Sequence, residues 1–167
     1  MDNLNLLIYQ ATQVVTSPVR EMTELKRTGI DHKGTVRFQD LFDLAMKNPQ
    51  ASKAGAIVTF TGIVRGYTHE GKEVEKLEMQ AYDELAEKAL GQISNELCAK
   101  KGVVDVIIHH LVGSFGVGED LVYVVVLADS RKNAFSTARE AVERYKKEVA
   151  VWKKEYLKDG SSYWVKE

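Results

Sequence analysis

Two long runs of β-branched and apolar residues follow each other in the second half of the chain, and they constrain the fold more than any other feature. The runs are VVDVIIHHLVG, Val103–Gly113, and EDLVYVVVLAD, Glu119–Asp129, joined by the segment SFGVG. Their composition predicts two strong strands. A phosphate-binding glycine loop would lead into a helix N-terminus, whereas here a strand follows. We therefore expect a tight connection between strands.

Other segments predict further strands. GAIVTFTGIVRG, Gly55–Gly66, is rich in β-branched residues and bounded by glycines, which indicates a long buried strand. TVRFQ, from Thr35, and EKLEMQAY, from Glu75, alternate with the period of a strand. In KDGSSYWV, the pair Asp159-Gly160 stands between two aromatic-bearing runs and predicts the turn of a C-terminal hairpin.

Helical periodicity appears in three segments between these strands. They are DLFDLAMKN, the long segment DELAEKALGQISNELCAKKG with Gly102 as its stop, and the residues from Asn133 to about Glu148. The residues expected to face the core are Leu41, Leu44 and Ala45 in the first, Leu85, Ala89, Ile93 and Leu97 in the second, and Phe135, Ala138, Val142 and Tyr145 in the third. Long strands mixed with a few helices favour an α+β fold.

The first thirty or so residues carry helix start and stop signals of their own. Ser17 is a candidate N-cap, Pro18 suits the first helical position, and Gly29 would follow the last turn. We therefore expect residues 1–32 to form a partly helical N-terminal extension, and residues 33–167 to form the main domain.

The bulk composition argues against several classes of protein. A chain of 167 residues can bury a real core, and it has no run of about 18 apolar residues that would span a membrane. The first ten residues, MDNLNLLIYQ, carry an acid where an export signal carries positive charge, so we expect a cytoplasmic protein. A formal net charge of -1 argues against general electrostatic capture of nucleic acid.

Cysteine and histidine offer little for metal chemistry. The single cysteine, Cys98, excludes a disulfide within the chain and is expected to be a half-buried side chain. His109 and His110 are adjacent in a predicted strand, so their side chains point to opposite faces. His32 and His69 lie in polar stretches without a partner at a metal-ligand spacing. We expect no metal site.

The stretch YKKEVAVWKKEYL, Tyr145–Leu157, places four lysines around a small apolar cluster. On a continuous helix, Lys146 and Lys153 would lie about 20° apart around the axis and roughly 10 Å apart along it, facing one pocket. If the helix ends near Val149, we expect Trp152 to pack inward and to leave the lysines near the helix end. Clustered, partly buried ammonium groups suit proton transfer or nucleophilic work. A solvated basic face is the alternative.

Two arginines stand where strongly apolar strands end. Arg65 closes TFTGIVRG, and Arg131 follows VVVLADS and precedes a predicted helix, whose N-terminal NH groups favour anions. Guanidinium and ammonium groups together describe a site for phosphate or another compact anion. The alternative is that both arginines are ordinary surface residues.

Four segments in order resemble the large, catalytic subunit of molybdopterin synthase. The segments are GAIVTFTGIVRG, LEMQAYDELAEKAL, VGSFGVGEDLVYVVVLADSRKNAF and VAVWKKEYLKDGSSYWV. The resemblance runs from about Thr35 to the C-terminus, and the combination is far more specific than any one motif. It implies an α+β hammerhead-type fold with a mixed sheet, packed helices and a C-terminal hairpin.

The resemblance also implies an activity and partners. The family transfers sulfur from the thiocarboxylated Gly-Gly tail of a small ubiquitin-like carrier protein to cyclic pyranopterin monophosphate, called precursor Z. Two sulfurs make the dithiolene of molybdopterin in molybdenum cofactor biosynthesis, without a cofactor. The enzyme is expected to be a homodimer within a heterotetramer, with active sites that draw on both chains. The lone Cys98 is consistent with sulfur that arrives on the partner.

Matching positions carry the family's functional residues onto this chain. The substrate-binding residues implied are Ile63, Val64, Arg65, Ser130, Arg131, Lys146, Lys153, Lys154 and Glu155. Arg65 and Arg131 would hold the phosphate and pterin side of the substrate. Lys146 would be the main acid/base or electrophile at the thiocarboxylate attack, and Lys153 would steady the anionic intermediate.

Three departures from the family pattern bear on these roles. Ser130 stands where the family commonly has histidine, Leu111 replaces an arginine after His110, and Ala150 stands where proline is common. Two other functions therefore remain as alternatives. One is a catalytically silent scaffold for the ubiquitin-like partner, and the other is an anion- or nucleic-acid-binding module that uses the basic C-terminal third.

Overall fold

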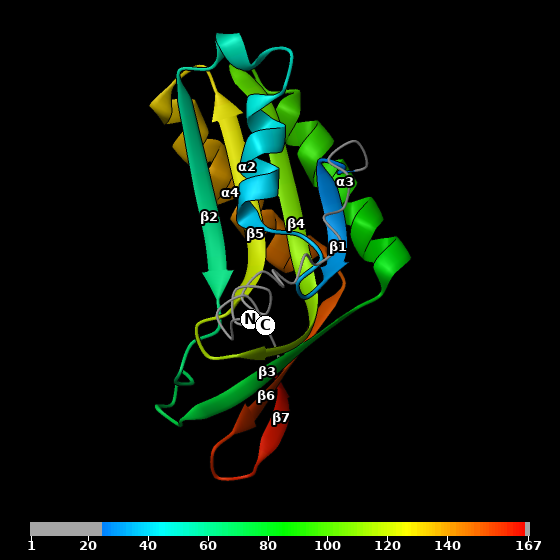
Figure 1. Cartoon of the computed structure of the whole chain (residues 1–167), viewed down its shortest axis with the longest axis vertical. Helices are drawn as coiled ribbons and strands as arrows, with labels where there is room; N and C mark the ends of the chain where they lie inside the picture. Colours follow the sequence, from blue (N-terminus) through cyan, green and yellow to red (C-terminus); the bar gives the residue numbers. More distant parts are fainter. Residues whose placement is uncertain (1–24, 166–167) are drawn as a thin grey trace, which may run out of the picture.

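The computed structural model describes residues 25–165, which form one mixed sheet with helices packed on it (Figure 1). The strands are β1 (Thr28–His32), β2 (Ala56–Ile63), β3 (Val74–Ala81), β4 (Val103–Gly116), β5 (Asp120–Ala128), β6 (Val151–Leu157) and β7 (Ser162–Val165). The helices are α2 (Phe38–Met46), α3 (Asp83–Cys98) and α4 (Arg131–Glu148), with a short 3-10 helix η2 (Ala51–Lys53). The α+β prediction is confirmed.

The sheet has two parts that share strand β4. In the main sheet, β4 lies between β5 and β1, and β2 pairs with the outer side of β5. Only the β1–β4 pairing is parallel among the described strands. The end of β4, Gly113–Gly116, pairs instead with β3, which continues through β6 to β7. These last strands form a crossing sheet that runs across one end of the main sheet (Figure 1).

A glycine marks the change from one part of β4 to the other. Gly113 has a φ of 123°, a conformation that residues with a side chain rarely adopt. Before it, His110 still pairs with Val122 of β5, and from Gly113 onward β4 pairs with β3. The long strand therefore changes direction here, and this places the crossing sheet over the end of the main one.

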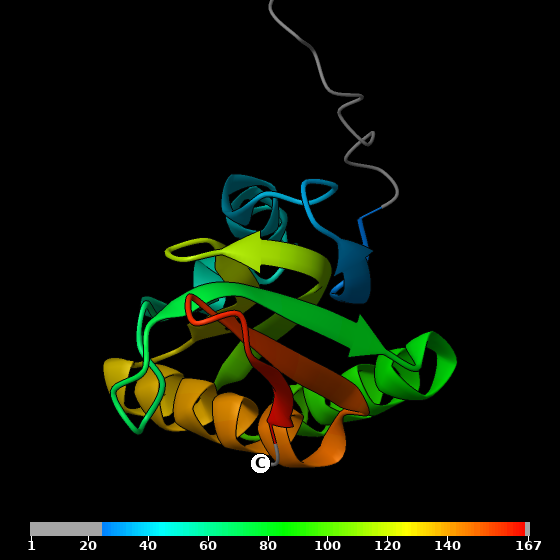
Figure 2. The ribbon, with the colours of Figure 1, turned by 90° about the horizontal axis from the view of Figure 1, so that it is seen from below.

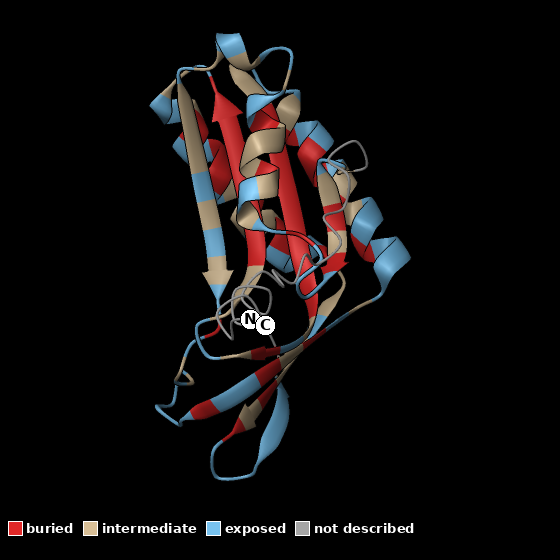
Figure 3. Ribbon diagram, viewed as in Figure 1, coloured by how far each residue is buried: buried red, intermediate tan, exposed pale blue. Residues whose placement is uncertain are grey.

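Helices cover both faces of the main sheet (Figure 2). Helices α3 and α4 lie on one face, where Leu90, Ile93 and other apolar residues meet Ile108 and Val124 of the central strands. Helix α2 lies on the opposite face. There Leu41 packs against the side chains of the central strands that point away from α3 and α4. Figure 3 shows that β4 and β5 are buried along most of their length. Each fully buried aliphatic side chain stabilises the fold by about 1.5–3 kcal/mol.

A buried hydrogen bond between His109 and Asp31 fastens β1 to the centre of the sheet. Nδ1 of His109 lies 2.6 Å from Oδ2 of Asp31, and its Nε2 lies 3.0 Å from the carbonyl oxygen of Lys26. The side chains of His109 and Asp31 are 2% and 5% exposed. Both ring nitrogens face oxygen acceptors, so the ring holds two points of the N-terminal segment. A Cβ at Gly29 would meet Asp31 at 2.8 Å, which explains the glycine in this strand.

Most predicted elements are confirmed. The strands read from GAIVTFTGIVRG, EKLEMQAY and the two central runs are β2, β3, β4 and β5, and the three periodic segments are α2, α3 and α4. The C-terminal hairpin is β6 and β7, with Gly160 in the turn at a φ of 85°. Within the described residues, no helix is long and apolar enough to cross a membrane.

Several details of the sequence prediction are wrong. TVRFQ is no strand, because Val36 lies in a bend and Phe38 begins α2. The strand β2 is not buried but lies at the edge of the sheet, with alternate residues exposed. The predicted core residues Leu85 and Phe135 are 54% and 65% exposed, because α3 and α4 turn neighbouring positions inward.

The prediction for the N-terminal extension is only partly tested. The predicted helix start, Ser17 and Pro18, lies outside the described residues. The predicted helix end is wrong, because Thr28–His32 form β1 and Gly29 lies within this strand. The last five residues of the proposed extension therefore belong to the main sheet, where they pair with Ile108–Val112 of β4.

Candidate functional site

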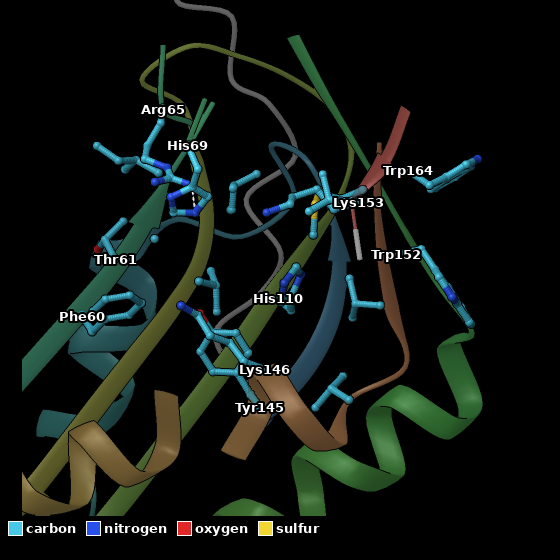
Figure 4. Close-up of a pocket in the computed structure, with 18 residues that line it drawn as sticks. Phe60, Thr61, Arg65, His69, His110, Tyr145, Lys146, Trp152, Lys153 and Trp164 are labelled. Atoms are coloured by element: carbon cyan, nitrogen blue, oxygen red, sulfur yellow. Dashed lines mark hydrogen bonds between the residues drawn. The ribbon is translucent and has the colours of Figure 1, made fainter. Parts of the chain in front are cut away.

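A cavity of about 960 Å³ lies where the main sheet, the crossing sheet and the C-terminal end of α4 meet (Figure 4). It is lined by Phe60, Thr61, Gly62, Ile63, Arg65, His69, Met79, His110, Leu121, Val122, Tyr145, Lys146, Val149, Val151, Trp152, Lys153, Trp164 and Val165. Three of these residues are Lys or Arg, and none of the described lining residues is Asp or Glu. Such a cavity has a positive potential and favours anions.

Lys146 lies in the last turn of α4. The helix ends at Glu148, because Val149 is extended (φ -92°, ψ 129°) and the β-branched residue Val151 begins β6. The preceding Tyr145 is buried and holds the helix end by edge-on contact with His110, with ring centroids 6.0 Å apart. An ammonium group near a helix C-terminus is favoured by the helix dipole. Lys146 is exposed and lines the cavity.

Lys153 reaches the same cavity from strand β6. It pairs with Met79 of β3 and Val165 of β7, which also line the cavity. Because side chains alternate along a strand, the neighbouring Lys154 lies on the opposite face, with its ammonium 4.9 Å from the ring centroid of Tyr156. In Figure 4, Lys146 and Lys153 approach one space from two elements.

Arg65 closes the cavity on the side of β2. The residue before it, Val64, is fixed by two backbone hydrogen bonds, since its N–H donates to Glu119 and its carbonyl accepts from Gly118. Val64 is buried in the core, and the next residue is therefore directed outward. An Nη2 hydrogen of Arg65 is donated to Nε2 of His69 over 3.1 Å (Figure 4).

His110 of β4 also lines the cavity (Figure 4) and is 5% exposed. Its Nδ1 lies 3.1 Å from the carbonyl oxygen of Leu111, which can only accept, so Nδ1 carries a proton. The contact between His110 and Tyr145 thus joins β4 to the end of α4 that carries Lys146.

The structure brings together only part of the predicted site. Ile63, Arg65, Lys146 and Lys153 line the cavity. Ser130 and Arg131 lie at the other end of α4, about 22 Å from Lys146 at 1.5 Å per helical residue. Within one chain, therefore, Arg65 lies beside the lysines and Arg131 does not, and the predicted role of Arg131 stays untested.

The remaining predicted site residues do not line the cavity, and each has contacts that stabilise the fold. Ser130 is the N-cap of α4, and its Oγ accepts from the backbone N–H of Asn133 over 3.4 Å. Val64 belongs to the core. Glu155 is buried and accepts a hydrogen bond of 2.8 Å from the hydroxyl of Tyr163, which raises the pKa of that tyrosine.

Sequence reasoning missed several residues of the cavity. His69 stood in a polar loop with no spacing signal. His110 was considered for metal binding and as part of a family motif, but it was not predicted as a site residue. Trp152 was expected to pack inward, but its side chain is 52% exposed at the cavity rim, because Lys153 takes the inward position on β6. Side chains alternate between the two faces of a strand, and this alternation along β6 is the sequence signal that could have predicted the orientation of Trp152. Within residues 25–165, no group of three or more His, Cys, Asp or Glu residues is placed to hold a metal ion.

Comparisons with known proteins agree on one family. A family profile described as MoaE protein matches residues 32–148. The probable molybdopterin synthase of Haloferax volcanii is 38% identical over 151 residues, which is 90% of this chain and 58% of that protein. The molybdopterin synthase catalytic subunit of Pyrococcus abyssi is 41% identical over 115 residues, 69% of this chain and 76% of that protein.

A solved structure gives the same result in three dimensions. The crystal structure of molybdopterin synthase from Staphylococcus aureus matches with a TM-score of 0.76 and 32% identity, over 86% of this chain and 99% of that chain. The fold expected from the resemblance is thereby confirmed. The chain spans little more than half the length of the Haloferax relative. The match to the Haloferax relative covers 90% of this chain. That match therefore begins well before residue 32, where the match to the family profile begins.

Proposed function

The chain belongs to the MoaE protein family, and from this membership we propose that it is the catalytic subunit of a molybdopterin synthase. In this role it transfers sulfur from the thiocarboxylated tail of a small ubiquitin-like carrier to precursor Z, forming the dithiolene of molybdopterin. One observation carries the proposal: Lys146, Lys153 and Arg65 converge from three elements on one cavity without a carboxylate in its described lining.

The cavity suits a phosphorylated ring system. Its volume of about 960 Å³ falls at the upper end of the usual range for small-molecule sites. The cationic groups provide for a phosphate, and Phe60, Trp152 and Trp164 offer apolar surface for a planar ring. The remaining space is sufficient for an extended Gly-Gly tail, whose lack of side chains permits close approach.

The two lysines divide the chemistry between them. A thiocarboxylate sulfur is a nucleophile, and its attack on a substrate carbon forms a carbon–sulfur bond and builds negative charge on the oxygen of that carbon. The carrier is then joined to the substrate as a thioester. Water cleaves this thioester, which releases the carrier as a carboxylate and leaves the sulfur on the substrate, while the displaced substrate oxygen departs as water. Lys146 supplies a proton or an electrophilic ammonium at that oxygen, and Lys153 stabilises the anionic intermediate from the facing strand. Such preorganised charge lowers a barrier by several kcal/mol, because it requires no reorganisation during the reaction. Arg65 binds the phosphate and pterin side.

A second copy of the chain supplies the second arginine that the cavity of one chain lacks. Arg131 lies far from its own cavity, and one helical turn later on the same face of α4 stands Phe135, which is 65% exposed. Trp152 and Trp164 at the cavity rim are 52% and 48% exposed. These apolar surfaces support a homodimer in which Arg131 serves the partner's cavity, within a heterotetramer that includes two carriers.

Reconstitution tests the function. Purified protein is mixed with thiocarboxylated carrier and precursor Z, and the dithiolene product is measured. Product formation that depends on both additions supports the proposal, whereas its absence with intact protein rejects it. If the protein binds the carrier without turnover, the silent-scaffold alternative is correct. Strongly salt-dependent RNA binding instead would favour the nucleic-acid alternative.

A further inference from the structure

The loop between β2 and β3 is ordered by hydrogen bonds within the loop, and it places His69 in the lining of the cavity. Thr68 organises the loop: its hydroxyl accepts from the backbone N–H groups of Glu70 and Lys72, each over 3.2 Å. Its own N–H donates to the carbonyl of Lys72 over 2.9 Å, and its carbonyl accepts from the N–H of Gly71 over 3.1 Å. The next residue, His69, therefore has a fixed place.

The contact between His69 and Arg65 defines the proton on the ring. A guanidinium has only donors, so Nε2 of His69 must accept the hydrogen bond of 3.1 Å from Nη2 of Arg65. The imidazole is then neutral and carries its hydrogen on Nδ1. In Figure 4 this pair stands on the side of the cavity opposite Lys153.

A neutral acceptor has an advantage over the usual partner of an arginine. A carboxylate would orient the guanidinium but would also cancel its charge, which would weaken the attraction for an anion. The neutral imidazole orients one edge of the Arg65 guanidinium and leaves the full positive charge of that guanidinium available to a ligand. The other N–H groups of Arg65 remain available for bidentate contact with a phosphate.

We propose that His69 is a positioning residue that holds the guanidinium of Arg65 in its phosphate-binding direction. This inference rests on the proposed function of the cavity. Arg65 is exposed and has a long side chain, whose rotamer freedom must be lost when an anion binds. By restricting that freedom in advance, His69 raises affinity for the substrate phosphate without touching the reacting atoms.

Matched substitutions test the role of His69. His69→Ala is expected to raise KM for precursor Z about fivefold, the effect of one hydrogen bond, while kcat changes by less than about twofold. His69→Gln, whose amide oxygen can accept from Arg65, is expected to restore KM to near the wild-type value. His32→Ala, at an exposed histidine in β1, is the control and should change neither constant.

A double substitution separates positioning from a general effect. In an Arg65→Ala background, His69→Ala should have no further effect on KM, because the group that it positions is gone. The proposal is overturned if His69→Ala leaves KM unchanged, if its effect persists in full without Arg65, or if His69→Gln behaves like His69→Ala. Melting temperatures within about two degrees of wild type confirm that the exposed substitutions leave the fold intact.

Binding of inorganic phosphate, measured by calorimetry, distinguishes the failure of this inference from the failure of the proposed function. If the wild type binds phosphate more tightly than His69→Ala but forms no dithiolene product, the positioning role stands and the sulfur-transfer function fails. If product forms and phosphate affinity is the same in both proteins, the positioning role fails alone. If the wild type binds neither phosphate nor precursor Z, both are rejected.

Discussion

The main sheet and the crossing sheet use strands in different ways. In the main sheet, Ile107, Ile108, Val124 and Val125 are fully buried, and helices cover both faces. In the crossing sheet, β7 has three exposed residues among its four, and the rings of Tyr156 and Trp164 lie beside the ammonium group of Lys154. The first arrangement provides stability, while the second leaves side chains accessible for chemistry.

The cavity lies at the boundary between these parts, and this position explains its composition. Its rigid wall comes from His110 and Val122 of the main sheet, which β4 and β5 hold in place. Its cationic wall comes from Lys153 on the crossing sheet and Lys146 at the end of a helix. A binding site between a rigid and an accessible part gains precise geometry and remains open to a substrate.

The largest effect on stability is expected in the core of the main sheet. Leu90→Ala removes a fully buried side chain of α3 and should lower the free energy of unfolding by about 3 kcal/mol, because of lost burial and the cavity that remains. Leu85→Ala changes the same residue type on the same helix, but at a position that is 54% exposed. It should change stability by less than about 0.5 kcal/mol. Urea unfolding measures both, and equal losses would contradict the assignment of the helix face.

A second pair of substitutions tests the fastening of β1 to β4. The Cβ of Gly29→Ala would approach Oδ2 of Asp31 to 2.8 Å and Nδ1 of His109 to 3.0 Å, so the buried pair must shift. We expect a loss of about 1–3 kcal/mol. The same change at Gly91, within α3, meets only Oγ1 of Thr28 at 3.9 Å among residues 25–165 and should stabilise by about 0.5–1 kcal/mol. Thermal melting compares the two, and a stable Gly29→Ala protein would contradict the tight packing.

The smallest effect is expected in the crossing sheet. Tyr156 donates a hydrogen bond of 2.7 Å to Glu78, and this bond lowers the pKa of that carboxyl. A folded-state pKa below the unfolded value means that the contribution is present above about pH 4.3, the ordinary pKa of Glu. It is lost as the pH falls through the lowered pKa. Tyr156→Phe should therefore be slightly less stable than wild type at pH 7, and the difference should be smaller at pH 3.

Unfolding curves at the two pH values measure this difference. A gap between Tyr156→Phe and wild type that grows on acidification would contradict the assignment of the hydrogen bond to the ionised carboxylate.

Local patterns predicted the central elements of the fold well. The runs around Val106 and Val124 combine length with β-branched residues, and their neighbours in space are also neighbours in sequence. The faces of α3 and α4 were less well predicted, because Leu85 and Phe135 fit an apolar stripe but tertiary packing selected the adjacent stripe. Exposed apolar residues are common on protein surfaces, so a stripe alone does not settle the direction.

Residues of the site could be predicted only where they lie close together in the sequence or where they belong to a family motif. Lys146 and Lys153 were identified. Of the two arrangements that the sequence left open, the structure has the one in which the helix ends near Val149 and a strand carries Lys153. His69 could not be predicted, since its role depends on a loop geometry set by Thr68. The separation of Arg131 from the cavity follows from the length of α4, which periodicity does give.

The central claim is that Lys146 is a chemical group of the cavity and not part of a solvated basic face. The most direct measurement compares product formation by Lys146→Ala and Lys147→Ala with thiocarboxylated carrier and precursor Z. Lys147 is adjacent and exposed, and its ammonium lies 3.9 Å from the Glu143 carboxylate, away from the lining. The account predicts a kcat about 100-fold lower for Lys146→Ala and an unchanged kcat for Lys147→Ala. Equal rates in the two variants would contradict it.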